Sequence, residues 1–259
     1  MKLTTRGPRM VLGGGITAAL LLLIGALGSR LGFWPFTVGF LFLMIGVVVA
    51  VLTTIAGSFV VVSALRRTGS SNYLAPGIGV GVCVLVMLVI GGQFVPAASL
   101  PPIHNISTDL EDPPQFEAIV PRRSGLNPHR YDAAQKIGDA GTLGDLQRAA
   151  YPELKTFRSA VSVLAGLERT VAILEDMGLE VVAVDRVTGR VEATATTFWF
   201  GFKDDVVVRL KAAGGVTSVD VHSVSRVGQG DLGVNARRIA TFLSQFAAME
   251  REDKSSVAP

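Results

Sequence analysis

One face of a predicted C-terminal sheet gathers a carboxylate, an imidazole and a guanidinium that together could do acid–base chemistry. Asp220 and His222 alternate with valines on the predicted strand 216–226, and Arg209 has matching parity on the predicted strand 204–211. A carboxylate and an imidazole can transfer protons, and a nearby arginine can hold an anionic group. These three residues are therefore the candidate catalytic residues.

Glu192 and Arg226 are predicted to lie on the same face, and they are candidate binding residues. The alternative is that all these charges form cross-strand ion pairs on a solvated face. A serine nucleophile is geometrically awkward here, because Ser223 and Ser225 alternate onto the side of the strand opposite to His222. Catalysis and a structural role both remain open from the pattern.

An aromatic run beside these strands supplies a second kind of candidate site. Phe198, Trp199, Phe200 and Phe202 follow in close succession, and Lys203 comes directly after them. Phe198 and Phe200 are candidate binding residues for lipid headgroups or for a partner protein. The alternative is that the aromatic run is packed inside the domain and is covered by the irregular segment at residues 103–128.

Residues 228–233 read Gly-Gln-Gly-Asp-Leu-Gly, which matches the dinucleotide-binding fingerprint between a strand and a helix. That fingerprint belongs to a βαβ unit with a further parallel strand, whereas one helix closes this chain. Asp231 also stands where it would cap the helix, which places a carboxylate where a pyrophosphate should lie. The pattern favours a capping turn, and no cofactor is expected.

Metal-ligand patterns are weak throughout the chain. The three histidines are far apart, at His104, His129 and His222, and the acidic run from Asp109 lacks the glycine and terminal glutamate of a calcium loop. The single cysteine, Cys83, lies in an apolar segment, which excludes a disulfide framework and a multi-thiolate metal site. No metal is expected.

Three apolar segments, at residues 11–28, 37–65 and 76–95, are long enough to span a bilayer and contain no ionisable side chain apart from that cysteine. The first is also compatible with a signal peptide that ends in small residues at 26–28. Glycines in these segments would let helices approach closely or are ordinary small residues facing lipid. Those glycines are Gly13, Gly14, Gly15, Gly46, Gly57, Gly79 and Gly81.

The charges around the spans predict their orientation. Lys2, Arg6 and Arg9 precede the first span, Arg66 and Arg67 follow the second, and Arg30 alone lies between the first two spans. All 21 acidic residues come after residue 101. Positively charged loops stay in the cytoplasm, so we expect a bacterial inner-membrane protein with a periplasmic C-terminal domain. The part after residue 101 has 18 basic residues against 21 acidic ones, so the excess of positive charge comes from the six basic residues that flank the spans. Nucleic-acid binding is therefore not expected.

The C-terminal half predicts an α+β domain in which helices flank a four-stranded antiparallel meander. An irregular arm at residues 103–128 is expected to lie over its core, and residues 146–151 make a helical turn or a strand. The boundaries are a transmembrane region at 1–100, the domain at 101–250 and a disordered tail at 251–259. The predicted elements are helices at 159–177 and 232–249 and strands at 179–186, 190–200, 204–211 and 216–226.

Four separated segments in this half, PPIHNISTDLEDPPQF, QRAAYPEL, VEATATTFWFGFKDDVVVRL and VHSVSRVGQGDLGVNARRI, resemble the domain-of-unknown-function 1499 family of bacteria and plastids. The resemblance covers roughly residues 103–246. It implies a domain that is often attached to a membrane, and it assigns no activity and no catalytic residue. The sequence therefore predicts a membrane-anchored binding or accessory module in the cell envelope, acting on a protein partner or an envelope lipid. The alternative is a hydrolase or transferase of envelope components that uses the polar sheet face.

Overall fold

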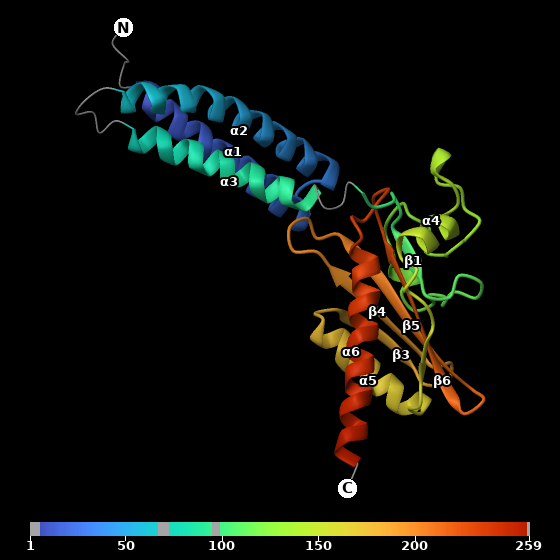
Figure 1. Ribbon diagram of the computed structural model, residues 1–259. Coiled ribbons are helices and arrows are strands. Elements are labelled where there is room, and N and C mark those ends of the chain that lie inside the picture. The colour runs from blue at the N-terminus through green and yellow to red at the C-terminus, as the bar shows by residue number, and fades with distance from the viewer. Residues whose placement is uncertain (1–5, 67–72, 95–98, 258–259) are drawn as a thin grey trace. The chain divides into compact units, whose positions relative to one another are not determined.

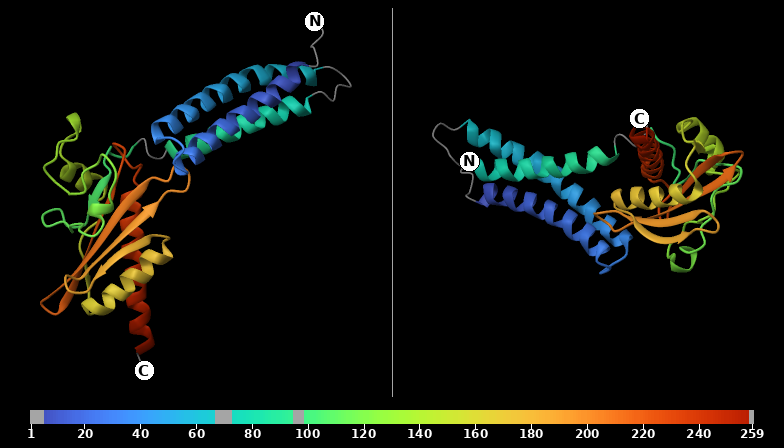
Figure 2. Two further views of the ribbon diagram at one scale, coloured as in Figure 1. Left: turned by 180° about the vertical axis from the view of Figure 1, so that it is seen from behind. Right: turned by 90° about the horizontal axis from the view of Figure 1, so that it is seen from below.

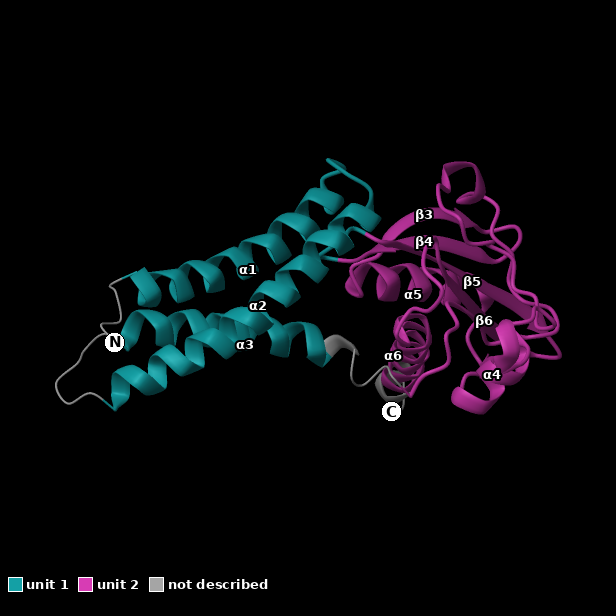
Figure 3. Cartoon of the chain, turned by 90° about the horizontal axis from the view of Figure 1, so that it is seen from above, with its two compact units in different colours: residues 1–96, 198–201 teal, residues 97–197, 202–259 magenta. Residues whose placement is uncertain are grey.

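The computed structural model describes residues 6–66, 73–94 and 99–257 (Figure 1). The chain divides into two compact units (Figure 3). The first consists of Met1–Pro96 together with Phe198–Gly201, and the second of Ala97–Thr197 together with Phe202–Pro259.

The first unit contains three helices that are long and apolar enough to cross a membrane. They are α1 (Arg6–Arg30), α2 (Phe36–Leu65) and α3 (Leu74–Phe94). Large side chains on their outer surfaces are exposed, as expected for helices surrounded by lipid. A helix covers each of the three predicted spans: α1 extends beyond both predicted ends, and α2 and α3 begin one and two residues earlier than predicted. Residue 95 lies outside the described residues.

Glycines bring these helices into close contact. A Cβ atom on Gly15 would lie 2.5 Å from the carbonyl oxygen of Gly79, and one on Gly25 would lie 2.8 Å from that of Gly39. A Cβ atom on Gly14, Gly57 or Gly46 would lie 2.4, 2.6 or 3.2 Å from its nearest neighbour, whereas one on Gly13 or Gly81 would meet nothing within 4 Å. The structure thus assigns a packing role to five of the seven glycines singled out in the sequence.

Replacing Gly79 by valine is expected to loosen the helical unit by about 1–3 kcal/mol, because the new side chain must enter space filled by backbone. Its Cβ atom would lie 2.5 Å from the carbonyl oxygen of Val11. Gly81→Val on the same helix is the matched control, since its Cβ atom meets nothing within 4 Å. Thermal denaturation of the detergent-solubilised full chain measures both, and equal melting temperatures would contradict this packing.

The second unit is an α+β domain built on a six-stranded antiparallel sheet. Its strand order is β1-β6-β5-β4-β3, and β2 also pairs with β6. The predicted four-stranded meander is present as β3 to β6, and two short strands, β1 and β2, extend it. The strands are β1 (Asn105–Ser107), β2 (Phe157–Ser159), β3 (Glu180–Asp185), β4 (Arg190–Thr196), β5 (Lys203–Ala213) and β6 (Val216–Ser225).

Three helices and two short 3-10 turns complete the domain: α4 (Leu143–Ala150), α5 (Val163–Asp176), α6 (Val234–Val257), η1 (Val120–Arg122) and η2 (Gly138–Ala140). The predicted start of α5 at residue 159 was too early. Ser159 belongs to β2, and the side chain of Ser162 caps the helix by accepting a hydrogen bond from the backbone N–H of Ala165. Helix α6 continues to Val257, through most of the segment predicted as a disordered tail.

The two faces of the sheet are covered differently (Figure 2). Helices α5 and α6 pack on one face, where alternating valines, alanines and Leu210 of the central strands meet Leu167, Leu174, Phe242 and Phe246. The opposite face carries the polar side chains and is covered by residues 103–128, the arm predicted from the sequence. The central strands are therefore covered on both faces, whereas β3 is partly exposed.

The aromatic run does not continue β4 as predicted. The strand ends at Thr196, and a turn follows in which the backbone N–H of Thr197 donates to the carbonyl of Phe202 at 2.8 Å. Gly201 has φ 68°, a left-handed conformation that favours glycine. Phe198 and Phe200 therefore lie in this turn, and their parity on the sheet face is lost.

Candidate functional site

The arm passes across the polar sheet face and pairs with its charged side chains one after another. That face is buried instead of solvated: Glu192 is 1%, Asp205 0% and His222 0% exposed. Glu192 lies opposite Val207 on the neighbouring strand, and Val207 lies opposite His222 on the next. The side chains of Glu192 and His222 therefore point to the same face of the sheet. A buried charge is tolerated only when it is paired or hydrogen-bonded. The partners supplied by the arm therefore decide the role of each group.

The side chain of Glu192 on β4 binds the middle of the arm. Its carboxylate accepts hydrogen bonds from three successive backbone N–H groups, those of Glu117 at 2.8 Å, Ala118 at 3.1 Å and Ile119 at 2.9 Å. The guanidinium of Arg190 lies 3.2 Å away on the same strand. Consecutive amides that converge in this way form an anion-binding nest, and here a side chain of the same domain occupies it.

Asp205 on β5 anchors the next part of the arm. It makes a bidentate ion pair with Arg226, with contacts of 2.8 and 3.0 Å, and a second ion pair with Arg123 of the arm. The hydroxyl of Thr194 donates to the same carboxylate at 2.9 Å. One fully buried carboxylate thus neutralises two guanidinium groups in part, which leaves the cluster with a formal charge of +1.

Arg209 and Asp220 are brought together, as their shared parity predicts. They are direct cross-strand partners, and their ion pair measures 3.2 Å. Arg209 also contacts Asp109 and Asp112 of the arm at 3.3 and 3.0 Å. The hydroxyls of Thr108 and Thr156 both donate to Asp220 as well.

His222 is placed among different partners. Its Nδ1 lies 2.8 Å from the carbonyl oxygen of Pro114, and its Nε2 lies 2.6 Å from the side-chain oxygen of Asn105. The rings of Phe116 and Tyr131 pack around it, with centroids 4.9 and 6.1 Å away. Among the described residues no hydrogen bond joins His222 to Asp220, so the three candidate catalytic residues form two separate groups.

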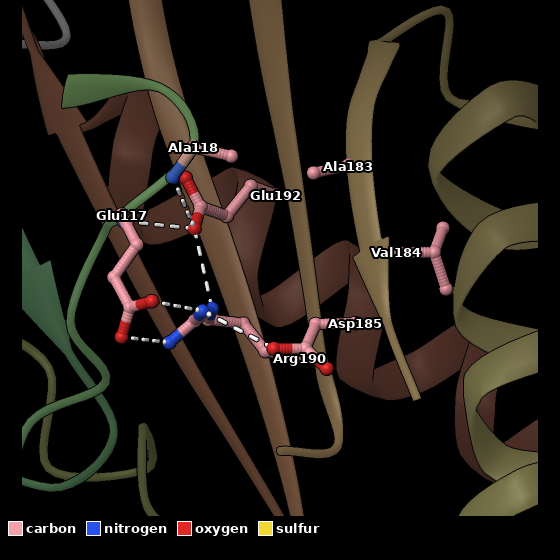
Figure 4. Close-up of a pocket in the computed structure, with 7 residues that line it drawn as sticks. All are labelled: Glu117, Ala118, Ala183, Val184, Asp185, Arg190 and Glu192. Carbon is pink, nitrogen blue, oxygen red and sulfur yellow. Dashed lines mark hydrogen bonds and ion pairs between the residues drawn. The ribbon is translucent and has the colours of Figure 1, made fainter. Parts of the chain in front are cut away.

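A recess opens where the arm meets the edge of the sheet (Figure 4). It has a volume of about 320 Å³ and is lined by Glu117, Ala118, Ala183, Val184, Asp185, Arg190 and Glu192. Arg190 contacts all three carboxylates, most closely Glu117 through two contacts of 2.6 Å, and then Glu192 at 3.2 Å and Asp185 at 3.5 Å. The lining therefore carries three carboxylates against one guanidinium.

The carboxylates of Glu117 and Asp185, near the mouth of this recess, are held in the ionised form. The hydrogen bond from Arg190 lowers the pKa of Glu117, and hydrogen bonds from Thr188 lower the pKa of Asp185. The side chain of Glu117 is 66% exposed and that of Asp185 is 36% exposed. An incoming group therefore meets a negative mouth, whereas Glu192 at the back is sealed from solvent.

The other predicted binding residues lie elsewhere. Arg226 is buried in the ion cluster of Asp205, and of the four candidates only Glu192 borders the recess. Phe198 and Phe200 belong to the first unit. There Phe198 is 68% exposed, and the ring of Phe200 lies 5.0 Å from that of Phe40.

Comparison with known proteins identifies the family of this domain. The model of the family described as "Protein of unknown function (DUF1499)" matches residues 105–246, which covers the arm, the sheet and most of α6. The chain belongs to the DUF1499 family. No curated protein matches the sequence. The matched residues include both the polar sheet face and the recess.

The glycine-rich turn of the DUF1499 domain is a helix cap, as its sequence favours. The carboxylate of Asp231 accepts hydrogen bonds from the backbone N–H groups of Gly233 at 2.8 Å and Asn235 at 2.7 Å at the start of α6. It therefore satisfies the amides that a phosphate would need. Gly228 and Gly233 have positive φ, which explains two of the three glycines of this turn, and Leu232 also has a positive φ of 55°.

Glu117, Asp185 and Arg190 of the DUF1499 domain were missed by the sequence reading. Asp185 and Arg190 flank a β-hairpin turn, and Asp185 accepts hydrogen bonds from the backbone N–H groups of Val187 and Thr188. That local pattern indicates a turn and conceals the second role of the carboxylate. Glu117 is 73 residues from Arg190, so no local spacing indicates their pairing.

The stability of the DUF1499 domain is expected to fall as the pH drops from 6.5 towards 4. Burial lowers the pKa of His222 to about 4, against 6.5 for the free side chain. Below pH 6.5 the unfolded chain binds a proton at this side chain and the folded domain does not. The contribution of His222 to stability is therefore constant above pH 6.5 and falls by about 3 kcal/mol as the pH drops to 4. Urea midpoints from pulse proteolysis of the full chain in nanodiscs measure the effect. His222→Asn should have a shallower pH dependence, and an equal slope in both proteins would contradict this assignment.

Proposed function

We propose that the protein is a membrane-anchored binding module that holds a partner protein at the outer surface of a bacterial inner membrane. One observation carries the proposal. The charges of the polar sheet face are engaged with the arm or with one another, whereas the recess beside β3 opens to solvent with a surplus of negative charge. A recess with converging polar groups is the default binding site of a domain. The DUF1499 domain would thus act by binding.

The orientation rests on the basic residues that flank α1 to α3. Arg6 and Arg9 precede the span of α1 and Arg66 ends α2, whereas Arg30 lies at the opposite end of α1. With the more basic ends in the cytoplasm, three spans bring the C-terminal domain to the periplasm. Protease added to intact spheroplasts should digest the domain after residue 101. Digestion only after lysis would overturn this topology.

An enzyme that uses the polar sheet face is the alternative, and the geometry favours it less. A general acid or base must reach the substrate within hydrogen-bonding distance. His222 is fully buried, and Asp220 and Arg209 are already joined to each other and to the arm. Reaction at these groups requires the arm to leave the sheet. Turnover of an envelope component by the full chain, abolished by Asp220→Asn, would establish the alternative.

Photo-cross-linking in native membranes tests the binding function. A photoreactive residue replaces Val184, which lines the recess and is 42% exposed, and a matched control replaces Leu126, which is 89% exposed on the arm. We expect one protein to be cross-linked from position 184 and to co-purify with the unmodified chain. Lipid adducts alone, or the same products from both positions, would refute a protein partner.

A further inference from the structure

We infer that the free edge of β3 docks an extended segment of the partner protein, and that a lysine or arginine of this segment enters the recess. The inference rests on the proposed function and assigns the surface and the chemistry of the partner. It follows from three features of the DUF1499 domain: an unpaired strand edge, a cavity beside it and the excess of carboxylates in that cavity.

The first feature is the edge. Strand β3 ends the order of the sheet and pairs on one side with β4 alone. An edge strand presents backbone N–H and C=O groups that can pair with another extended chain. Its six residues match the length of a typical added strand. The pairing register shifts between Val181 and Ala183, which places a bulge within this edge.

The second feature is the space beside the edge. Two small residues, Ala183 on β3 and Ala118 on the arm, face each other across the recess (Figure 4). Their methyl groups leave a cavity of about 320 Å³, which is sufficient for a long side chain from a docked strand. Added strands gain affinity from main-chain hydrogen bonds and specificity from pockets that take alternate side chains.

The third feature is charge. Arg190 is the single cation among three carboxylates that line the recess, and two of these, Glu117 and Asp185, are partly exposed. A second cation would balance them, whereas an acidic side chain or an anionic lipid headgroup would be repelled. Charge complementarity therefore selects a basic residue on the incoming segment.

A peptide titration of the full chain in nanodiscs tests the docking. The probe is a seven-residue peptide of alternating threonine and valine with a central arginine. One control peptide has glutamate in place of the arginine, and another carries N-methyl groups on alternate backbone nitrogens. Fluorescence anisotropy reports binding, and hydrogen exchange reports protection of β3. We expect the arginine peptide alone to bind and to slow exchange in β3.

Two variants of the protein make the test specific. Asp185→Asn keeps the oxygen that accepts hydrogen bonds in the hairpin turn and removes the charge. It should therefore lower the affinity for the arginine peptide roughly fivefold. Asp132→Asn is the matched control, because Asp132 accepts the same kind of turn hydrogen bond outside the recess. It should leave binding unchanged.

Several results would overturn the inference. They are equal binding of the glutamate or the N-methylated peptide, an unchanged affinity in Asp185→Asn, or protection of β3 without peptide that grows with protein concentration. The last result would assign the edge to a second copy of the chain. If cross-linking from position 184 still identifies a partner protein, only the docking mode is wrong and the binding function stands.

Discussion

Replacing Asp205 by asparagine is expected to lower the free energy of unfolding of the DUF1499 domain by about 3–5 kcal/mol. Asparagine fits the same space but leaves Arg123 and Arg226 buried without a counter-charge. Removing one partner of a buried ion pair costs far more than removing an exposed pair, because the remaining charge cannot be solvated. Asp205→Asn therefore carries the largest expected effect in the domain.

Pulse proteolysis in urea measures this change on the full chain in nanodiscs, since the protease cleaves the unfolded domain selectively. Asp132→Asn serves as the control, because Asp132 is exposed and its turn hydrogen bond is retained. A loss below about 1 kcal/mol in Asp205→Asn would mean that solvent reaches the cluster.

Glu192→Gln is expected to cost about 2–4 kcal/mol and to release the arm locally. A glutamine side chain has one acceptor oxygen, and its amide group would point a donor at backbone N–H groups that are themselves donors. At least one of the three amides that now bind the carboxylate is therefore left unpaired. Arg190 also loses one of its three carboxylates.

The matched control is Glu180→Gln, the same substitution at an exposed position on the neighbouring strand β3. Urea midpoints should fall for Glu192→Gln alone, and hydrogen exchange of residues 115–123 should accelerate more than that of β5 and β6. Equal acceleration of hydrogen exchange across the whole domain would show that Glu192 stabilises the sheet in general and does not specifically bind the arm.

Much of the fold could be predicted because it depends on patterns that are local in the sequence. Apolar stretches without charge predicted the three long apolar helices, and alternating valines predicted β5 and β6 with their polar and apolar faces. Strands β1 and β2 were missed, since three residues are too few to show periodicity. β4 was predicted too long, because its aromatic residues have high strand propensity although the chain turns after Thr196.

The candidate site was less predictable, because its contacts join distant parts of the chain. The parity of Arg209 and Asp220 correctly predicted that they meet. No local pattern could show that amides near residue 118 bind Glu192, which lies 73 to 75 residues further along. The arm covers the polar face through those contacts. Because the arm also supplies the partners of His222, the separation of His222 from Asp220 could not be predicted either.

Amide hydrogen exchange of the full chain in lipid nanodiscs tests most directly whether the buried charges serve to hold the arm and leave the β3 edge for binding. The amides of Glu117, Ala118 and Ile119, which donate to Glu192, should exchange as slowly as those of β4. Strand β3 should exchange faster than β4, β5 and β6. Exchange of the three arm amides at the rate of an unstructured chain would contradict the central claim, because the polar sheet face would then be open to a substrate.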